Sequence, residues 1–455
     1  MSGVVAIFTI ISGNLASASQ RFFSFELGRN DNSELRSLFM LTKGIYLLLG
    51  ICIIIFGELI VNLFIEEVFN YPESKKQIVN YIFRCSIYSL AIRVNIIPNY
   101  SILIAKERFI QYVSILTLDS IMSLLIAIML VYSDRPIYDY SLGLVLSSVI
   151  VLILSSIITF SLFGYSSFWI SFNQVQLKKL FSYTSWSIIG SLAAVMKTQG
   201  LSLILFNFFG PLISSSHALT MRVNSAYENF GDSVLTAAKP RLVKLYARKD
   251  SSQMINTLVK SMLLLIFPLL AVLMVAVFKT NFLLQIWLTE VPVNLVIFVR
   301  FTLIATFIEF TTRPLVALIQ ATGKIRFYSL IMALVQLIFI AIVYILFVNE
   351  ADVLVAYILM LLFALVSINA RLLVANRILE FNIWEVYRPL IIPVLQVILV
   401  NAIIYLILGF IVTSPLLSLV LMICAFLGTS IYLGIPKSYR IELYAKFHES
   451  IVRRR

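Results

Sequence analysis

The sequence predicts an all-α integral membrane protein that crosses the bilayer about thirteen times. Three observations predict this class. The 455-residue chain is 60% hydrophobic and 13% charged, with a mean hydropathy of +0.98, which is more apolar than a soluble chain of this length can bury. It contains thirteen apolar stretches of 16 to 27 residues, and a helix needs about 20 such residues to cross roughly 30 Å of hydrocarbon. Lys and Arg residues gather in every second gap between the stretches.

The apolar stretches form a block of five, a block of six and a final pair. The least apolar of them is 218–237, because it contains Arg222, Glu228 and Asp232. The predicted spans are 4–19, 38–64, 78–104, 109–132 and 141–163, then 186–209, 218–237, 254–278, 294–320, 329–348 and 353–370, and finally 389–410 and 416–433.

The basic residues set the predicted orientation. Alternate gaps, starting with the one that holds Arg21, Arg29 and Arg36, contain 23 of the 35 Lys and Arg residues, whereas the intervening gaps contain 4. Short loops rich in Lys and Arg stay on the cytoplasmic side. We therefore expect a multi-pass membrane protein with the C-terminal tail on the cytoplasmic side and Met1 outside. The net charge of +13 is explained as a topology signal and calls for no nucleic-acid partner.

Several classes of protein are excluded by what the residues do not provide. The first twenty residues are not a secretory signal, because no Lys or Arg precedes the apolar run and Arg21 follows it on the predicted cytoplasmic side. Cys52, Cys85 and Cys424 lie singly in spans, which predicts neither disulfides nor a zinc site. With only His217 and His448, and without a Gly-rich phosphate loop, we expect no metal, no cofactor and no enzymatic activity.

The chemistry must then lie in ionisable residues inside the spans, where a charge at mid-bilayer costs about 2.5–3.5 kcal/mol. In the span 218–237, polar residues recur at helical spacing and fall within a strip about 100° wide at 100° per residue. They are Arg222, Ser225, Asn229, Asp232 and Ser233. A polar strip of this kind lines a water-filled cavity or packs on another polar helix, and we favour the cavity.

Other spans contain further ionisable residues. Lys197 interrupts an apolar run, and Glu309 lies one helical turn before Arg313, either as a local ion pair or as a coupling or gating pair. In the first block, Arg93 is a better candidate than Arg84, which points to the other side of the same helix. Asp119 is a lone acid that pairs with an Arg or carries a proton. The spans contain eight cations and five acids, an excess that suits an anionic head group such as a diphosphate; composition equally allows a drug or ion transporter.

Six segments, in order along the chain, resemble polysaccharide (O-antigen) flippases of the Wzx type, within the multidrug/oligosaccharidyl-lipid/polysaccharide exporter superfamily. Together they extend over residues 19–325. They are 19–29 (SQRFFSFELGR), 105–108 (AKER), 199–200 with 209–211 (QG, FGP), 238–241 with 245–247 (AKPR, LYA), 287–288 with 291–292 (WL, VP) and 321–325 (ATGKI).

The resemblance implies two facing helical bundles, an additional helix pair and alternating access. On this plan the chain divides into 1–163, an N-terminal bundle matching family helices 2 to 6; 164–185, a cytoplasmic link; 186–380, a six-helix bundle; 381–435, the additional pair; and 436–455, a basic cytoplasmic tail. The family plan has fourteen spans, so we expect that the first family helix is missing here, through a late start codon or a truncated gene.

The resemblance also implies a cargo, an undecaprenyl diphosphate-linked oligosaccharide moved from the cytoplasmic to the periplasmic leaflet for polysaccharide or lipopolysaccharide synthesis. Polysaccharide polymerase and chain-length machinery would then be partners, besides the membrane lipids. For head-group contact we select Arg222, Arg93, Lys197, Arg313, Asn229 and Ser225. For proton or cation coupling we select Asp232, Glu228, Glu309 and Asp119. Two alternatives stay open: a drug or cation antiporter of the same fold, and an integral membrane enzyme of polysaccharide assembly.

Overall fold

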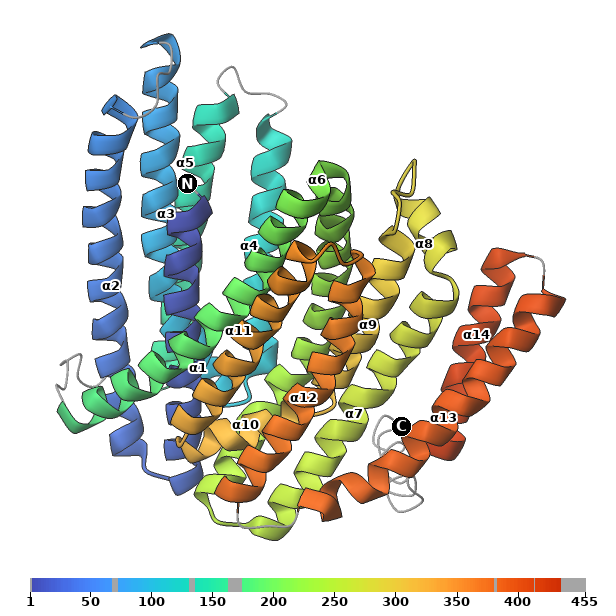
Figure 1. Ribbon diagram of the computed structural model, residues 1–455. Helices are drawn as coiled ribbons and strands as arrows, with labels where there is room; N and C mark the ends of the chain where they lie inside the picture. Colours follow the sequence, from blue (N-terminus) through green and yellow to red (C-terminus); the bar gives the residue numbers. More distant parts are fainter. Residues whose placement is uncertain are drawn as a thin grey trace, which may run out of the picture. The chain divides into compact units, whose positions relative to one another are not determined.

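The computed structural model describes residues 2–67, 73–130, 136–162, 174–379, 383–412 and 414–434, and this part of the chain contains helices and turns but no strand (Figure 1). The predicted all-α class is confirmed. The predicted tail, 436–455, lies outside the described residues. The helices are α1 (Ser2–Arg29), α2 (Asn32–Glu67), α3 (Glu73–Ala105), α4 (Phe109–Met129), α5 (Pro136–Ser161), α6 (Gln174–Ala247), α7 (Ser251–Phe278), α8 (Thr280–Trp287), α9 (Leu295–Phe310), α10 (Arg313–Thr322), α11 (Arg326–Val348), α12 (Leu354–Ile378), α13 (Ile383–Ile411), α14 (Pro415–Thr429) and a π-helical turn, Ser430–Gly434.

Ten helices of the described chain are long and apolar enough to cross a membrane, or eleven if the bent pair α9 and α10 is one span. The prediction of about thirteen spans differs for two reasons. Helix α6 holds two predicted spans, 186–209 and 218–237, and the first predicted span lies in α1, which is not among the ten. Two departures are corrections: the span 294–320 is broken between α9 and α10, and the predicted loop after residue 278 contains the short helix α8.

The long helix α6 is interrupted at Gly210. This residue has φ 78° and ψ −175°, a conformation that only glycine adopts readily, and Pro211 next to it cannot donate a backbone hydrogen bond. The two parts of α6, before and after Gly210, are therefore two separate helices, as predicted from the gap between the two apolar stretches. Pro240, which we expected to follow a helix end, instead lies inside the second part, since α6 continues to Ala247.

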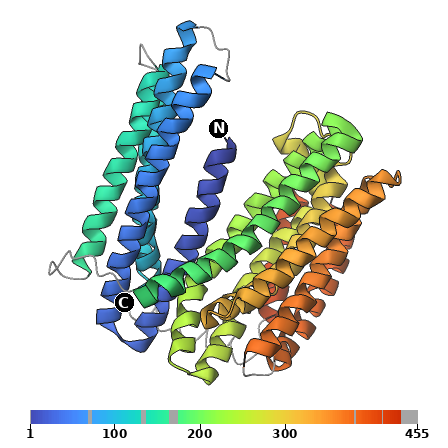
Figure 2. The same ribbon diagram turned by 60° about the vertical axis from the view of Figure 1, so that its left-hand side comes forward.

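The chain divides into two compact units. Unit 1 comprises Met1–Ile188 and Val243–Lys249, and unit 2 comprises Ile189–Leu242 and Asp250–Arg455. In unit 1, α3 packs along both α2 and α5 (Figures 1 and 2). Fully buried polar side chains join α3 to α5: Asn99 Nδ2 donates to Ser155 Oγ at 2.9 Å, and Thr159 Oγ1 donates to Asn99 Oδ1 at 3.1 Å. Such hydrogen bonds and small residues hold helices together where lipid removes the hydrophobic driving force.

The joints of unit 1 are set by local sequence. Asn30, with φ 58°, ends α1, while the N–H of Asp31 bonds the carbonyl of Glu26 at 3.3 Å. That arrangement satisfies carbonyls at the end of a helix and favours Asn or Gly. The Asp31 carboxylate then accepts from the N–H of Glu34 at 3.0 Å, which caps α2. The same turn recurs after α3 at Glu107, with φ 59°.

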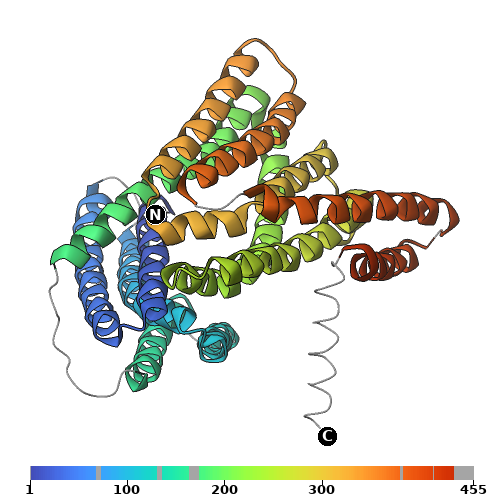
Figure 3. The ribbon, with the colours of Figure 1, turned by 90° about the horizontal axis from the view of Figure 1, so that it is seen from below.

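Unit 2 has an aromatic core between α9, α11 and α12. The fully buried rings of Phe298 and Tyr357 are stacked with centroids 4.0 Å apart, and the Tyr357 hydroxyl is 2.8 Å from Nδ1 of buried His217. Helices α11 and α12 run side by side, as do α13 and α14 (Figure 3). Helix α13 also packs on α7, so the last pair is attached to unit 2.

Candidate functional site

The candidate site is centred on the break between α9 and α10 in unit 2, where the helix axes are bent by 42°. Pro314, at the start of α10, lacks the N–H that would continue the helical hydrogen bonds, and its ring disfavours a helical conformation at the preceding residue. Thr312 makes the tighter bond from its N–H to the Glu309 carbonyl, at 3.4 Å. The break therefore leaves carbonyl groups that need other partners inside a membrane span.

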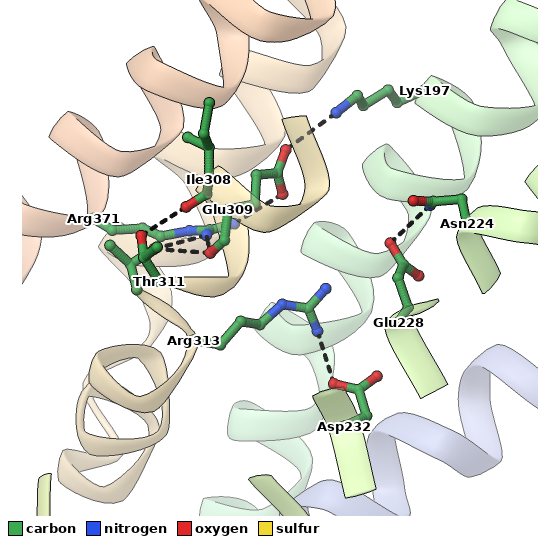
Figure 4. A network of polar contacts seen from close by, with 10 residues as sticks. Lys197, Asn224, Glu228, Asp232, Ile308, Glu309, Thr311, Arg313 and Arg371 are labelled. Carbon is green, nitrogen blue, oxygen red and sulfur yellow. Dashed lines mark hydrogen bonds and ion pairs between the residues drawn. The ribbon is translucent and has the colours of Figure 1, made fainter. Parts of the chain in front are cut away.

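Arg371 of α12 supplies a partner for one of these carbonyls, that of Glu309. Its Nη1 donates to the Glu309 carbonyl at 2.8 Å and to Thr312 Oγ1 at 2.9 Å, and its Nη2 pairs with Glu309 Oε2 at 3.3 Å (Figure 4). The side chain is 6% exposed. One buried guanidinium thus bonds a backbone carbonyl of the break and neutralises the acid beside it, which a planar group with five donors does better than an ammonium.

Glu309 has a second cation on its other side. Lys197 Nζ, from the first part of α6, lies 3.4 Å from Glu309 Oε1 and 5.4 Å from the ring centroid of Phe339. The two carboxylate oxygens therefore face different helices, α6 and α12. Held between two cations, Glu309 is stabilised as the charged form.

Arg313 pairs elsewhere than predicted. We expected Glu309 and Arg313 to share one turn of one helix, but the break intervenes, and Arg313 Nη1 lies 3.3 Å from Asp232 Oδ1 of α6, with its guanidinium 4.4 Å from the ring centroid of Phe310. The side chains of Arg313 and Asp232 are 34% and 49% exposed, so this pair is much wetter than the pair of Glu309 with Arg371.

Glu228 lies between these two pairs and has a neutral partner. Asn224 Nδ2 donates to Glu228 Oε1 at 3.2 Å, and Thr306 Oγ1 of α9 donates to Asn224 Oδ1 at 2.7 Å. In the described chain, no Lys or Arg is within ion-pair distance of the Glu228 carboxylate. Glu228 is thus the acid of the site whose charge is least compensated, and the one that a proton or a cation would neutralise at least cost.

The second part of α6 presents two polar faces rather than one. Asn224, Glu228 and Asp232 recur at a spacing of four residues toward α9 and α10 (Figure 4). Four members of the predicted strip, Arg222, Ser225, Asn229 and Ser233, are exposed, and Ser225 Oγ donates to its own helix at Met221. Only Asp232 of the predicted strip joins the network. The network does not have the excess of cations that we expected of a cavity, because its three cations, Lys197, Arg313 and Arg371, balance its three acids, Glu228, Asp232 and Glu309.

The remaining predicted residues lie in unit 1. Arg93 and Asp119 form a two-pronged ion pair between α3 and α4, with Nη1 2.9 Å from Oδ2 and Nη2 3.1 Å from Oδ1. Arg84, on the same helix, pairs with Glu58 of α2 at 3.2 Å, and the Tyr88 hydroxyl donates to Glu58 at 2.7 Å. Of the two roles considered for Asp119, the structure gives the pairing with an Arg.

Arg371 is the member of this network that the sequence analysis missed, because we placed it in a basic loop after a span ending at residue 370. The apolar residues Leu372, Leu373 and Val374 that follow it were the available evidence that the helix continues, and α12 indeed extends to Ile378. In the described chain, no group of three or more His, Cys, Asp or Glu residues has the arrangement of a metal site.

Comparison with known proteins identifies the fold. No protein-family model matches the sequence, and no curated protein matches it. A mutant of the Vibrio cholerae MATE transporter VcmN is similar in structure, with a TM-score of 0.69 and 14% identity over 83% of this chain and 86% of that one. A multidrug resistance MATE family transporter of the MOP superfamily, in its outward-facing conformation, gives a TM-score of 0.67 and 16% identity over 82% of this chain and 84% of that one. The protein is therefore a multi-pass membrane protein with the fold of the MATE transporters, and these neighbours are transporters rather than enzymes.

Proposed function

We propose that the protein is a secondary transporter that moves its cargo by alternating access, and that the network around the break of α9 and α10 takes part in coupling. The observation that carries this proposal is the broken membrane span with charged side chains from four helices gathered on it. Discontinuous helices at membrane depth are where transporters bind substrates and coupling ions, and ionisable residues inside a membrane are functional by default, given their cost.

The three acids of the network have different roles in this proposal. Glu309, held by Lys197 and Arg371, stays charged and fixes the break. Glu228 is the coupling residue, because among the described residues its carboxylate has only the amide of Asn224 as a hydrogen-bond partner and gains most from a proton or a cation. The half-exposed pair of Asp232 with Arg313 is the contact that opens or closes as the cavity changes access. Asp119 remains a second coupling candidate, in unit 1.

The comparisons support antiport of a cationic, drug-like solute better than transport of a lipid-linked oligosaccharide, because the structural neighbours are MATE transporters and one is described as a multidrug resistance transporter. In this version, Glu228 exchanges a coupling cation for the solute. Arg222, Ser225 and Asn229 would then line the route rather than bind a diphosphate.

Transport of a lipid-linked oligosaccharide is the second candidate. It is supported by the six sequence segments that resemble those of polysaccharide flippases in the same order along the chain. Three of these segments form joints of the fold: 105–108 is the turn after α3, 209–211 is the break in α6, and 321–325 holds Gly323, which ends α10 with φ 76°. Turns and helix breaks reflect the fold, which drug transporters and polysaccharide flippases of this superfamily would share, more than they reflect the cargo. This version includes a polysaccharide polymerase partner and an inner-membrane location with a cytoplasmic C-terminus. Its head-group contacts are the predicted residues Arg222, Arg93, Lys197, Arg313, Asn229 and Ser225.

One pair of assays separates the candidates. The chain is expressed in bacteria that lack their main drug exporters, where efflux of ethidium is followed, and in a strain that lacks its polysaccharide flippase, where surface polysaccharide is measured. We expect efflux with the wild-type chain and its loss in Glu228→Gln. Glu290→Gln, in the exposed turn before α9, is the matched control and should behave as wild type. Restored polysaccharide without efflux would replace antiport by lipid-linked transport, and neither activity in a correctly inserted protein would overturn both.

A further inference from the structure

Lys43 of α2 is a cation in unit 1 that has no charged partner among the residues that the structure describes. It is half-buried within a candidate membrane span, and in the described chain no carboxylate is within ion-pair distance of its ammonium group. Its Nζ instead lies 5.9 Å from the ring centroid of Phe39 and 5.6 Å from that of Phe160. Aromatic faces attract a cation but do not neutralise it. A lone charge inside a membrane span is costly unless something else compensates it.

An apolar groove begins at this lysine. A cavity of about 470 Å³ lies between α2, α3 and α5, and Lys43 is part of its wall. Along α2 the lining residues recur every three or four positions, from Met40 through Leu47 to Ile54. Leu47 and Ile51 are 54% and 45% exposed, so the groove is open along its length rather than enclosed.

The geometry orients an occupant. Side chains of a helix lean toward its N-terminus, so the ammonium of Lys43 points toward the start of α2 at Asn32, and a long side chain can raise its charge in that direction. From Met40 to Ile54 the groove extends for roughly 21 Å at 1.5 Å per residue, compared with roughly 15 Å for one leaflet of a 30 Å hydrocarbon core. An acyl chain of one leaflet fits this length when its head group lies at Lys43.

We propose that this groove binds a membrane phospholipid with an anionic head group, its phosphate at Lys43 and one acyl chain between α2, α3 and α5. The uncompensated cation selects the charge, and the apolar, open wall selects a chain that the surrounding bilayer supplies. The groove lies wholly within unit 1, whereas the network of the proposed function lies in unit 2. The proposal therefore stands or falls independently of transport.

Native mass spectrometry of the purified full chain tests this, with phosphatidylglycerol and phosphatidylcholine of identical acyl chains as competing probes. The wild type should retain phosphatidylglycerol preferentially. Lys43→Ala should lower that preference about fivefold, which corresponds to about 1 kcal/mol for one basic residue near a membrane surface, and Lys43→Arg should keep it. Lys43→Gln serves if the alanine variant does not fold.

A matched pair of neighbours tests the groove itself. Leu47→Trp fills it and should displace both lipids, whereas Leu48→Trp, at a 60% exposed position that does not line the groove, should bind as wild type does. Unchanged phosphatidylglycerol preference in the folded lysine variants would overturn the proposal. So would equal behaviour of the two tryptophan variants, or preferential binding of added oleate at Lys43 in place of the phospholipid.

Discussion

Arg371 should be the most sensitive position of unit 2, because one side chain both bonds the backbone at the break and compensates the charge of Glu309. Replacing it by Ala removes contacts at 2.8, 2.9 and 3.3 Å and leaves Glu309 with Lys197 alone. Removing one partner of a buried pair costs about 3–5 kcal/mol. At roughly 2–4 °C per kcal/mol for a unit of this size, Arg371→Ala should lower the Tm by about 6–20 °C.

A double-mutant cycle with Glu309→Gln separates charge compensation from backbone satisfaction. If the pair is coupled as the structure indicates, the double variant should lose about 1.5–3 kcal/mol less than the sum of the single variants, the usual strength of a hydrogen bond to a charged group. Arg371→Lys should fall between wild type and Arg371→Ala, because an ammonium keeps the charge but not the planar set of donors.

The assay is thermal unfolding of the detergent-purified protein, followed by size-exclusion recovery. Arg377→Ala is the control on the same helix: its side chain is exposed and stacks on Phe327 with the guanidinium 5.3 Å from the ring centroid, a contact that contributes about 0.5–1 kcal/mol. Additive effects of Arg371→Ala and Glu309→Gln, or an Arg371→Ala Tm within 2 °C of the Arg377→Ala value, would show that Arg371 does not compensate Glu309 as described.

Two further predictions concern packing and pH. Gly231→Ala should destabilise unit 2 by about 1–3 kcal/mol, despite the better helix propensity of Ala, because a Cβ there would lie 2.3 Å from Phe310 Cε1. Thermal unfolding measures this loss of stability. If the clash is the cause, Phe310→Leu should restore stability in the double variant. Asp31→Ala should speed amide hydrogen exchange at Glu34, because the carboxylate accepts from that N–H and its pKa is lowered by this bond. A lowered carboxyl pKa stabilises the folded form above the ordinary carboxyl range, and this effect is lost as the pH falls through the lowered value, so the difference in exchange between wild type and Asp31→Ala should shrink in acid. Asp31→Asn keeps a capping oxygen without titrating and should show a cap of constant strength. Equal exchange at Glu34 in wild type and Asp31→Ala at neutral pH would contradict this assignment.

The class of the protein could be predicted from the sequence, because a membrane span depends on a local quantity, the run of apolar residues. The break in α6 at Gly210 and Pro211 was also visible as a gap between two apolar stretches. Charged residues inside spans could likewise be listed from the sequence, and Lys197, Glu228, Asp232, Glu309 and Arg313 do meet in one network. What each of them pairs with could not be listed.

The partners of these charged residues follow from the way the helices pack. Glu309 and Arg313 are four residues apart, and helical spacing placed them together, yet Pro314 breaks the helix and each finds a partner on another helix. Arg371, 62 residues from Glu309, enters the site because α12 packs against the break. An intramembrane charge is compensated by whichever opposite charge the packing of helices brings near, and that choice depends on contacts between distant segments that no local pattern encodes.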